Sequence, residues 1–486
     1  MHPTRSLLAL AALTLASTPT IDAQTITLDG ILSDWPEGVH TLADASHVYV
    51  RVDLEDTTSL QSSQRAIHLR FDLDGDDTTG TSFPQPPDEG VDLEIVISPS
   101  FGNSRQDDFV TARIIPHSSD VSGEVSIPIV DLLWAPTHAS DSFEIRFDRA
   151  GELGPLIQSS SNATLQISAF ESDSSLAWQR EPVPFTLPPY ESRAPSSAAI
   201  PERPESTIRV VSWNVRWGNP YMHPERFDRV FQALDPDVLL LQEWDMRDSP
   251  PDTRAQIVEW FTQSLPDVTT WGAERGNAAG VVIVSRFPIE RFSPYDVQPI
   301  TEGLELARDD RTVRFIGARI RTPQGDLLTG SFHLKCCGSH NGYEDHQRRA
   351  EARGINAIVE QAINQETPTG VFLAGDMNLV GGAEPLLDLI DSLDLDGSHL
   401  SDTHTPILGD NVLSTWAGFD TRFPRGRLDY ALYSDATIDV VNSFILDVSV
   451  LSPQVLDAHG LEPDDRDASD HLPLVFDLLM RGESTE

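Results

Sequence analysis

The chain has 486 residues, 39% hydrophobic and 23% charged, so it is long enough for two or three globular domains and is not bulk disorder. Its 76 acidic residues outnumber 34 basic ones, which gives a formal net charge of −42 at pH 7. A field of this sign repels polyanions and excludes a broad nonspecific nucleic-acid-binding surface, although a small positive cleft remains compatible with it. Lys335 is the only lysine. This composition suits a saline environment, where salt screens self-repulsion beyond about 8 Å.

The first 23 residues predict a secretory signal peptide. His2 and Arg5 form a mildly basic start, an apolar run follows at residues 7–13, and cleavage near Ala23 is expected. That run is too short to span a bilayer core of ~30 Å, and no other segment approaches about 18 continuous apolar residues. We therefore expect a secreted, periplasmic or cell-surface protein without stable membrane insertion.

Residues 24–187 alternate between apolar and polar side chains. Such period-two patterning is typical of half-buried strands, and no long helical pattern interrupts it. The clearest strands are expected at residues 47–54, 67–71, 91–95, 143–147 and 165–167. Short strands at this spacing predict an all-β sandwich domain. The Pro- and Ser-rich residues 188–206 that follow have few large apolar side chains and predict an extended linker.

Residues 207–486 mix buried strands with helical patterns. Apolar runs at 238–241 and 281–284 predict buried strands, and residues 343–365 predict a long amphipathic helix. Because strands and helices interleave, the pattern favours an α/β domain.

Polar residues recur where the predicted strands of this second domain end. In chain order they are Asn214, Glu243, His333, Asp376 with Asn378, Asp429, and Asp470 with His471. One such residue alone is typical of a turn or a cap. Six such positions in succession are harder to explain as turns, and they predict a single polar site.

The order of these residues resembles the endonuclease/exonuclease/phosphatase superfamily. The most specific motifs are Gly-Asp-Met-Asn at residues 375–378 and Ser-Asp-His-Leu-Pro at residues 469–473. The likeness covers essentially all of 207–486 and implies a DNase I-like, four-layer α/β/β/α sandwich behind the all-β domain. The sequence His-Leu-Lys-Cys-Cys-Gly at 333–338 elaborates the usual histidine motif and leaves the subfamily open.

The resemblance also implies a divalent cation, Mg²⁺ or Mn²⁺, which prefers oxygen ligands. By position, Glu243 is the first expected ligand and Asp470 the second, with Asn214 as a nearby amide ligand or phosphate contact. The cation would polarise the phosphoryl group and offset the charge that develops in the transition state.

Catalytic roles follow from the resemblance in the same way. Asp376 would orient or deprotonate the attacking water, and Asn378 would hold a phosphate oxygen. His471 would bind the phosphoryl oxygen or act as an acid or base, with Asp429 fixing its tautomer. His333 would contact the phosphate from the other side.

Several basic and sulfur-containing residues near these motifs have two open interpretations. Lys335 and the cluster Arg422, Arg425 and Arg427 are expected either to bring positive charge to the site or to be solvated surface residues. The adjacent cysteines at 336 and 337 form either a strained vicinal disulfide or two free thiols. The polar residues His340, Asn341, His346 and Arg348 are expected to be surface residues unless they shape specificity.

The N-terminal domain resembles family 9-like carbohydrate-binding modules through two short motifs, Asp-Gly…Ser-Asp-Trp at 29–35 and Asp-Leu-Asp-Gly-Asp at 72–76. That resemblance implies bound Ca²⁺, and Asp72, Asp74 and Asp76 alternate as hard-cation ligands would. An acidic hairpin turn explains the same pattern. A glycan is the further partner that this likeness suggests.

The sequence as a whole predicts a secreted, metal-dependent phosphoester hydrolase, with phosphodiesters favoured as substrates. Nucleic acid, a phospholipid headgroup and a small phosphodiester all remain open, and the acidic field disfavours long duplex DNA. The alternatives are a phosphomonoesterase of the same fold and a non-catalytic cell-surface or glycan-binding protein.

Overall fold

The computed structural model describes residues 26–481 except 64, 85–86, 99–111, 118–122, 151–152, 155, 158–159, 269, 278–279 and 419–422. The predicted signal peptide and Arg422 therefore lie outside the described residues. Within these residues, no helix is long and apolar enough to cross a membrane.

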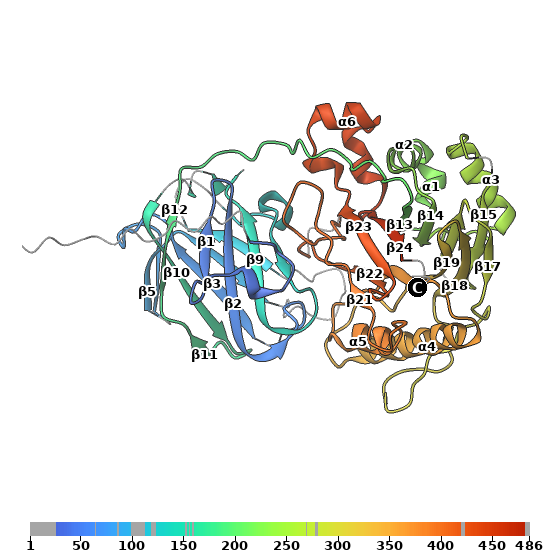
Figure 1. The fold of residues 1–486 in the computed structure, drawn as a ribbon. Helices are drawn as coiled ribbons and strands as arrows, with labels where there is room; N and C mark the ends of the chain where they lie inside the picture. The colour runs from blue at the N-terminus through green and yellow to red at the C-terminus, as the bar shows by residue number, and fades with distance from the viewer. Residues whose placement is uncertain are drawn as a thin grey trace, which may run out of the picture.

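The N-terminal part is a sandwich of two mainly antiparallel sheets (Figure 1). The first sheet has the order β1 (Thr41–Ala43), β2 (His47–Thr58), β9 (Ser140–Asp148) and β8 (Leu133–Ala135). The second has the order β11 (Leu176–Gln179), β10 (Ser160–Phe170), β3 (Ala66–Asp72), β6 (Leu93–Ile97) and β7 (Ala112–Pro116), with β12 (Val183–Leu187) also paired to β10. The hairpin β4 (Thr81–Pro84) and β5 (Pro87–Val91) and the 3-10 turns η2 (Leu32–Asp34) and η3 (Ile127–Val130) complete this part.

Alternation along the strands builds the core of the sandwich. The inward-facing side chains of the two sheets form one buried hydrophobic cluster. Within it, the rings of Phe71 in β3 and Phe147 in β9 meet edge to face across the sheets, with centroids 5.5 Å apart. The predicted all-β architecture is thus confirmed.

The C-terminal part contains two six-stranded sheets packed face to face. One has the order β15 (Gly272–Arg275), β16 (Val282–Ser285), β14 (Val238–Gln242), β13 (Ile208–Asn214), β24 (Leu474–Met480) and β23 (Ile438–Ile445). The other has the order β17 (Ile289–Arg291), β18 (Phe315–Thr322), β19 (Gly325–His333), β20 (Gly370–Asp376), β22 (Asp429–Tyr433) and β21 (Ser401–Asp402).

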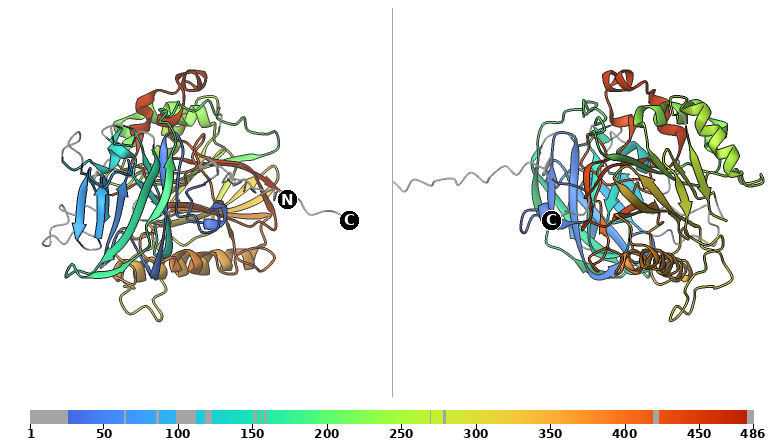
Figure 2. Two further views of the ribbon diagram at one scale, coloured as in Figure 1. Left: turned by 90° about the vertical axis from the view of Figure 1, so that its left-hand side faces the viewer. Right: turned by 45° about the vertical axis from the view of Figure 1, so that its right-hand side comes forward.

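Helices cover the outer face of each sheet. The first sheet carries α1 (Asn219–Met222), α2 (Pro224–Leu234), α3 (Arg254–Ser264) and α6 (Pro453–His459), with the 3-10 turns η5 (Val448–Val450) and η6 (Pro463–Ala468) beside them. The second carries α4 (Tyr343–Gln365) and α5 (Glu384–Ile390). In both views of Figure 2, α4 lies along the lower side and α6 at the top. Helix α4 has the bounds that its apolar periodicity predicts.

Three separate hydrophobic clusters hold these four layers together. One lies between the helices and the first sheet, one between α4, α5 and the second sheet, and one between the sheets. In the central cluster the rings of Phe372 in β20 and Phe476 in β24 lie 5.3 Å apart. Strands buried on both faces read as continuous apolar runs, as β14 does. The predicted four-layer α/β/β/α class is confirmed.

An extended segment joins the two parts and passes along the top of the molecule in Figure 1. Residues 188–207 contain no helix and no extended strand, but they lie against the C-terminal part. The backbone of Ser196 hydrogen-bonds to Val450 and Ser452 at 2.7 and 2.8 Å, and Ile200 is buried in the outer core. Arg193 pairs with Asp410 at 2.7 Å. These contacts fix the path of the segment.

Candidate active site

Strand register brings three of the predicted residues into one row. Strands β19 and β20 are parallel with His333 opposite Asp376, and the antiparallel pairing of β20 with β22 sets Asp376 opposite Asp429. In the other sheet β13 and β14 are parallel, so Asn214 and Glu243 lie at the same edge. Parallel strands end at a common edge, and this gathers residues that are far apart in the chain.

Asp429 and His471 form a buried ion pair. Nδ1 of His471 lies 2.7 Å from Oδ2 of Asp429, and neither side chain is more than 8% exposed. Burial opposes the charged imidazole, but the carboxylates of Asp429 and Asp376 outweigh it and raise the pKa of His471 to about 10. Nδ1 therefore donates to Asp429, and Nε2 faces Asp376 at 3.8 Å. His471 is held as an imidazolium with one N–H bond directed at the site.

Asp376 lies at the centre of the row. Its Oδ1 accepts from the backbone N–H of Asn378, and its Oδ2 accepts from Nδ2 of Asn214, both at 3.0 Å. Burial, with the nearby charges of Asp429 and Glu243, raises the pKa of Asp376 to about 7, although His471 opposes the shift. A carboxylate with this pKa can accept a proton near neutral pH.

Glu243 follows β14 and is the carboxylate with the least support from hydrogen bonds. Its backbone has a φ of 58°, an uncommon conformation for this residue type, directly after a fully buried strand. In the described part of the chain no N–H or O–H group donates to its carboxylate, and Nε2 of His333 lies 3.8 Å from it. Burial raises the pKa of Glu243 to about 7.

His333 is neutral and lies beside a cation that the sequence motifs do not reveal. Burial, with the charge of Arg314, lowers the pKa of His333 well below its ordinary value of 6.5. Nη1 of Arg314 lies 3.2 Å from Nε2 of His333, and Nη2 donates to the carbonyl of Leu334. Arg314 directly precedes β18, and only the pairing of β18 with β19 brings it here.

Three of the predicted site residues, Asn214, Asn378 and Asp470, have polar partners that the sequence does not reveal. The Asn214 side chain binds Asp376 and the backbone N–H of Arg216, so it orients the carboxylate. Nδ2 of Asn378 donates to the carbonyl of Leu334 at 3.2 Å, which leaves its second N–H bond for a ligand. Asp470 does not line the pocket described next, and its carboxylate lies 4.0 Å from Arg216.

The gathered side chains open into a pocket of about 700 Å³. Glu243, His333, Asp376, Asn378 and His471 line it together. This volume is in the range of small-molecule sites. The row of polar residues therefore lies at the floor of a cavity that can admit a ligand.

The cysteine pair also lines this pocket, and both residues are free thiols. A hydrogen bond from the Cys337 thiol lowers the pKa of Cys336 to about 5, with Lys335 adding to the shift. Nζ of Lys335 donates to the carbonyl of Cys336 at 3.0 Å. Of the two interpretations of the pair, the free thiols are the form present.

The two described residues of the arginine cluster do not supply charge to the pocket. Arg425 pairs with Asp131 at 3.3 Å and with Asp447 at 2.9 Å. Arg427 pairs with Asp402 over the ring of Tyr430. Each guanidinium is already neutralised by a carboxylate. Arg425 and Arg427 are therefore neither solvated surface residues nor sources of positive charge for the site.

The N-terminal acidic turn gathers a set that differs from the predicted one in one member. Asp72, Asp74 and Asp92 lie with ligand atoms within 4.8 Å of one another. The Asp76 carboxylate is turned to Thr78 instead, at 2.6 Å from its hydroxyl. Asp92 joins because its Oδ2 accepts from the backbone N–H of Leu73 at 2.8 Å, a pairing of distant segments.

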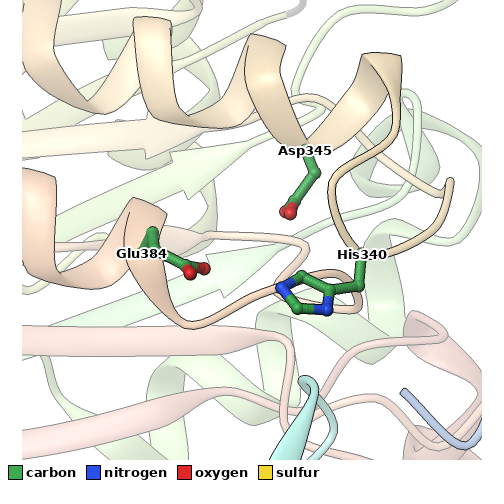
Figure 3. Close-up of side chains that lie close together, drawn as sticks. All are labelled: His340, Asp345 and Glu384. Carbon is green, nitrogen blue, oxygen red and sulfur yellow. The ribbon is translucent and has the colours of Figure 1, made fainter. Parts of the chain in front are cut away.

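A further group consists of His340, Asp345 and Glu384, whose side chains lie close together (Figure 3). Ser339 and Glu344, next to it in the chain, line the pocket. Asp345 is 1% exposed and accepts from the backbone N–H groups of Asn341 and Gly382 and from Arg348. Its carboxylate is therefore saturated by donors and ties the start of α4 to the loop before α5. This structural role accounts for its burial.

The donor set at the pocket floor fits a hard divalent cation. Glu243 is a carboxylate that is 13% exposed and has no donor, and Oδ1 of Asp429 is buried without a hydrogen-bond partner within the described ranges. Oxygen ligands of this kind are what Mg²⁺ and Mn²⁺ prefer. A cation would also stabilise the charged forms of Glu243 and Asp376, whose pKa values are raised by burial and by neighbouring carboxylates.

A known family covers the C-terminal part of the chain. The sequence model described as Endonuclease/Exonuclease/phosphatase family matches residues 211–471. No curated protein matches the sequence.

Similar solved structures include the human Nocturnin catalytic domain with bound sulfate (16% identity, 58% of this chain and 97% of that chain, TM-score 0.35). Sphingomyelinase C from Streptomyces griseocarneus is 16% identical over 56% of this chain and 99% of that chain, with a TM-score of 0.37. A Staphylococcus aureus beta toxin with bound magnesium ions gives the same four values.

Proposed function

The chain belongs to the endonuclease/exonuclease/phosphatase family, and from that premise we propose that it is a divalent-metal-dependent phosphodiesterase. The single observation that carries the proposal is the convergence of Glu243, His333, Asp376 and His471 on one pocket. Together with Asp429, the partner of His471, these residues come from five separate strands or strand ends. Each is a residue type that phosphoester hydrolysis requires.

We place the cation at Glu243, with Asp376 and Asp429 as neighbouring carboxylates. When bound, it would polarise the phosphoryl oxygens and offset negative charge in the transition state. The Asp470 ligand role remains a proposal that would require the carboxylate to turn away from Arg216.

The side chains of the pocket have separate roles in proton transfer and phosphate binding. Asp376, held by Asn214 and the backbone of Asn378, accepts the proton of the attacking water. The His471 imidazolium donates through Nε2 to a phosphoryl oxygen, and its other N–H bond is occupied by Asp429. The neutral His333, beside Arg314, binds the phosphate from the opposite side. The side chains of Asp376, Asp429, His333 and His471 are buried, so their electrostatic effect on the substrate is weakly screened.

Two finer expectations remain proposals. The first 23 residues support secretion of the protein. The group of Asp72, Asp74 and Asp92 supports Ca²⁺ binding in the sandwich, as does the likeness to carbohydrate-binding modules.

The test is turnover of bis(p-nitrophenyl) phosphate by metal-free protein with added Mg²⁺ or Mn²⁺, beside p-nitrophenyl phosphate as the monoester. We expect activity that EDTA abolishes, preference for the diester, and a loss of about 10²- to 10⁴-fold in kcat for Asp376→Asn. The matched control is Asp267→Asn, an exposed aspartate outside the pocket, which should keep full activity. Absence of metal-dependent turnover of either ester would overturn the proposal.

A further inference from the structure

The N-terminal sandwich is fixed to the C-terminal domain by buried charges. Arg146 in β9 is 1% exposed and donates to both oxygens of Asp410, at 2.8 and 3.2 Å. Asp131, from the sandwich, lies 3.3 Å from Arg146 and also from Arg425, which in turn binds Asp447. A buried charge that loses its partner is strongly destabilising, so such a network specifies one docking position.

Backbone pairing and apolar packing continue the same interface. Leu28 exchanges backbone hydrogen bonds with Asn411 and Leu413, at 2.8 and 3.0 Å. Leu28 and Leu133 of the sandwich are buried in the hydrophobic cluster between the two C-terminal sheets. The sandwich thus shares a core with the domain that carries the site, unlike a module on a flexible tether.

The sandwich also holds the two loops that carry site residues. Oγ of Ser59 donates to the carbonyl of Val380 at 3.0 Å, and the N–H of Ala139 donates to the carbonyl of Gly381 at 2.7 Å. Val380 and Gly381 follow Asn378 by two and three residues. Oγ1 of Thr137 accepts from the N–H of Arg427 at 2.9 Å, two residues before Asp429.

The pocket consequently has walls from both domains. Gln61, Ser62 and Thr137 of the sandwich line it together with the catalytic row. The same pocket has an apolar region formed by Trp416, Phe423, Pro424 and Leu428. Trp416 is placed beside the catalytic row because its backbone pairs with His471 in a β-bridge.

We propose that the N-terminal sandwich forms the far wall of the substrate pocket and restricts the enzyme to compact phosphodiesters that carry a flat apolar group. This proposal rests on the proposed function and names its substrate class. The phosphate lies over the catalytic row, and the flat group lies on Trp416 in the apolar region, since stacking on an aromatic ring suits any planar ring system.

The charge and size of the pocket favour this class over polymers and membrane lipids. A cavity of about 700 Å³ holds a ligand of nucleoside size, and Gln61, Ser62 and Thr137 of the sandwich line it on the side away from the C-terminal domain's own residues. The formal net charge of −42 disfavours a polyanion outside the pocket. The contacts of Arg146 and Arg425 show that interface arginines are used internally and are not offered to phosphates.

The test compares kcat/KM for two diesters with the same leaving group, methyl p-nitrophenyl phosphate and thymidine 5′-(p-nitrophenyl phosphate), in the full chain. Both esters carry the p-nitrophenyl ring, and only the thymidine ester carries a second planar ring on the other side of the phosphate. The wild type should prefer the thymidine ester. Trp416→Ala should reduce that preference about five- to hundredfold, which corresponds to the loss of one stacked base. Supercoiled plasmid and sphingomyelin vesicles should be poor substrates.

A bulky substitution in the sandwich tests the wall directly. Gln61→Trp should lower kcat/KM for the thymidine ester by at least tenfold more than for the methyl ester. Gln179→Trp, at an exposed site in β11, is the matched control and should leave the ratio unchanged. If Gln61→Trp lowers the melting temperature, Ser62→Phe replaces it.

The outcomes separate the two proposals. If the wild type hydrolyses neither diester with any divalent metal, the proposed function fails. If it hydrolyses both, but the substitutions at 61 and 179 give the same ratio, only the wall is overturned. Efficient cleavage of plasmid or vesicle lipid would likewise overturn the restriction to compact diesters.

Discussion

Replacing Asp429 with asparagine removes the negative charge that holds His471 as an imidazolium and changes the shape of the side chain very little. In the structure the pair lies at 2.7 Å and is fully buried. The pKa of His471 is raised from 6.5 to about 10 despite burial, which corresponds to roughly 5 kcal/mol in favour of the charged form. Asp429 contributes more of this than the second carboxylate, Asp376.

Without the charge of Asp429, the pKa of His471 should fall from about 10, because burial favours the neutral imidazole and only the carboxylates of Asp376 and Asp470 still oppose it. Loss of the positive N–H bond at the phosphate should lower kcat/KM by about 10²- to 10⁴-fold at pH 7. The direct measurement is NMR titration of the His471 ring in metal-free protein, beside the kinetics of bis(p-nitrophenyl) phosphate hydrolysis.

The control for this experiment is Asp439→Asn, an exposed carboxylate that pairs with Arg481 far from the pocket. It should change neither the titration of His471 nor the kinetics. If His471 in Asp429→Asn still titrates above about 9, the carboxylate does not hold the imidazolium, and the assignment of the pair is wrong.

Two other perturbations have clear expected results. Glu243→Gln should weaken Mg²⁺ binding by at least tenfold in isothermal titration calorimetry, because it replaces the carboxylate that has no donor with a neutral amide. The circular dichroism spectrum should not change. Unchanged affinity would remove Glu243 from the metal site. Asp410→Asn removes the nearer of the two carboxylates that pair with the buried guanidinium of Arg146, which then keeps only Asp131 at 3.3 Å, and should cost up to about 3–5 kcal/mol of unfolding free energy at pH 7. Burial opposes the charged form of Asp410, but Arg146 and Arg193 lower its pKa below the ordinary 3.8. Its stabilisation is therefore complete above pH 3.8 and is lost as the pH falls through the lower folded-state value, so the deficit of the variant should shrink in acid; a constant deficit would contradict the charge argument.

The site motifs could be found in the sequence because each one sits at a strand end. Asp376 and Asn378 follow a buried strand, and Asp429 opens another, so local pattern already marks them. The same holds for the α4 helix, whose apolar side chains recur at helical spacing. The contacts among these residues could not be found in this way, because the 2.7 Å pair of Asp429 and His471 joins residues 42 positions apart.

Residues without a local signal were missed or misjudged. Arg314 reaches His333 only through strand pairing. Asp92, between β5 and β6, replaces Asp76 in the acidic turn because its carboxylate binds the backbone N–H of Leu73. Arg425 has the charge that a phosphate site would use, but two carboxylates from other segments already neutralise it. Neither the composition nor a motif shows which carboxylate of the folded chain lies next to a given arginine.

The sequence by itself determined the two classes of architecture, the order of the predicted site residues and the amphipathic helix, because hydrophobic periodicity and strand-end chemistry are local properties. Only the tertiary structure decided that the sandwich supplies part of the pocket through Gln61, Ser62 and Thr137. That contact depends on long-range packing and on paired charges such as Arg146 with Asp410. Such partners lie hundreds of residues apart, and their energies arise only when both are buried together.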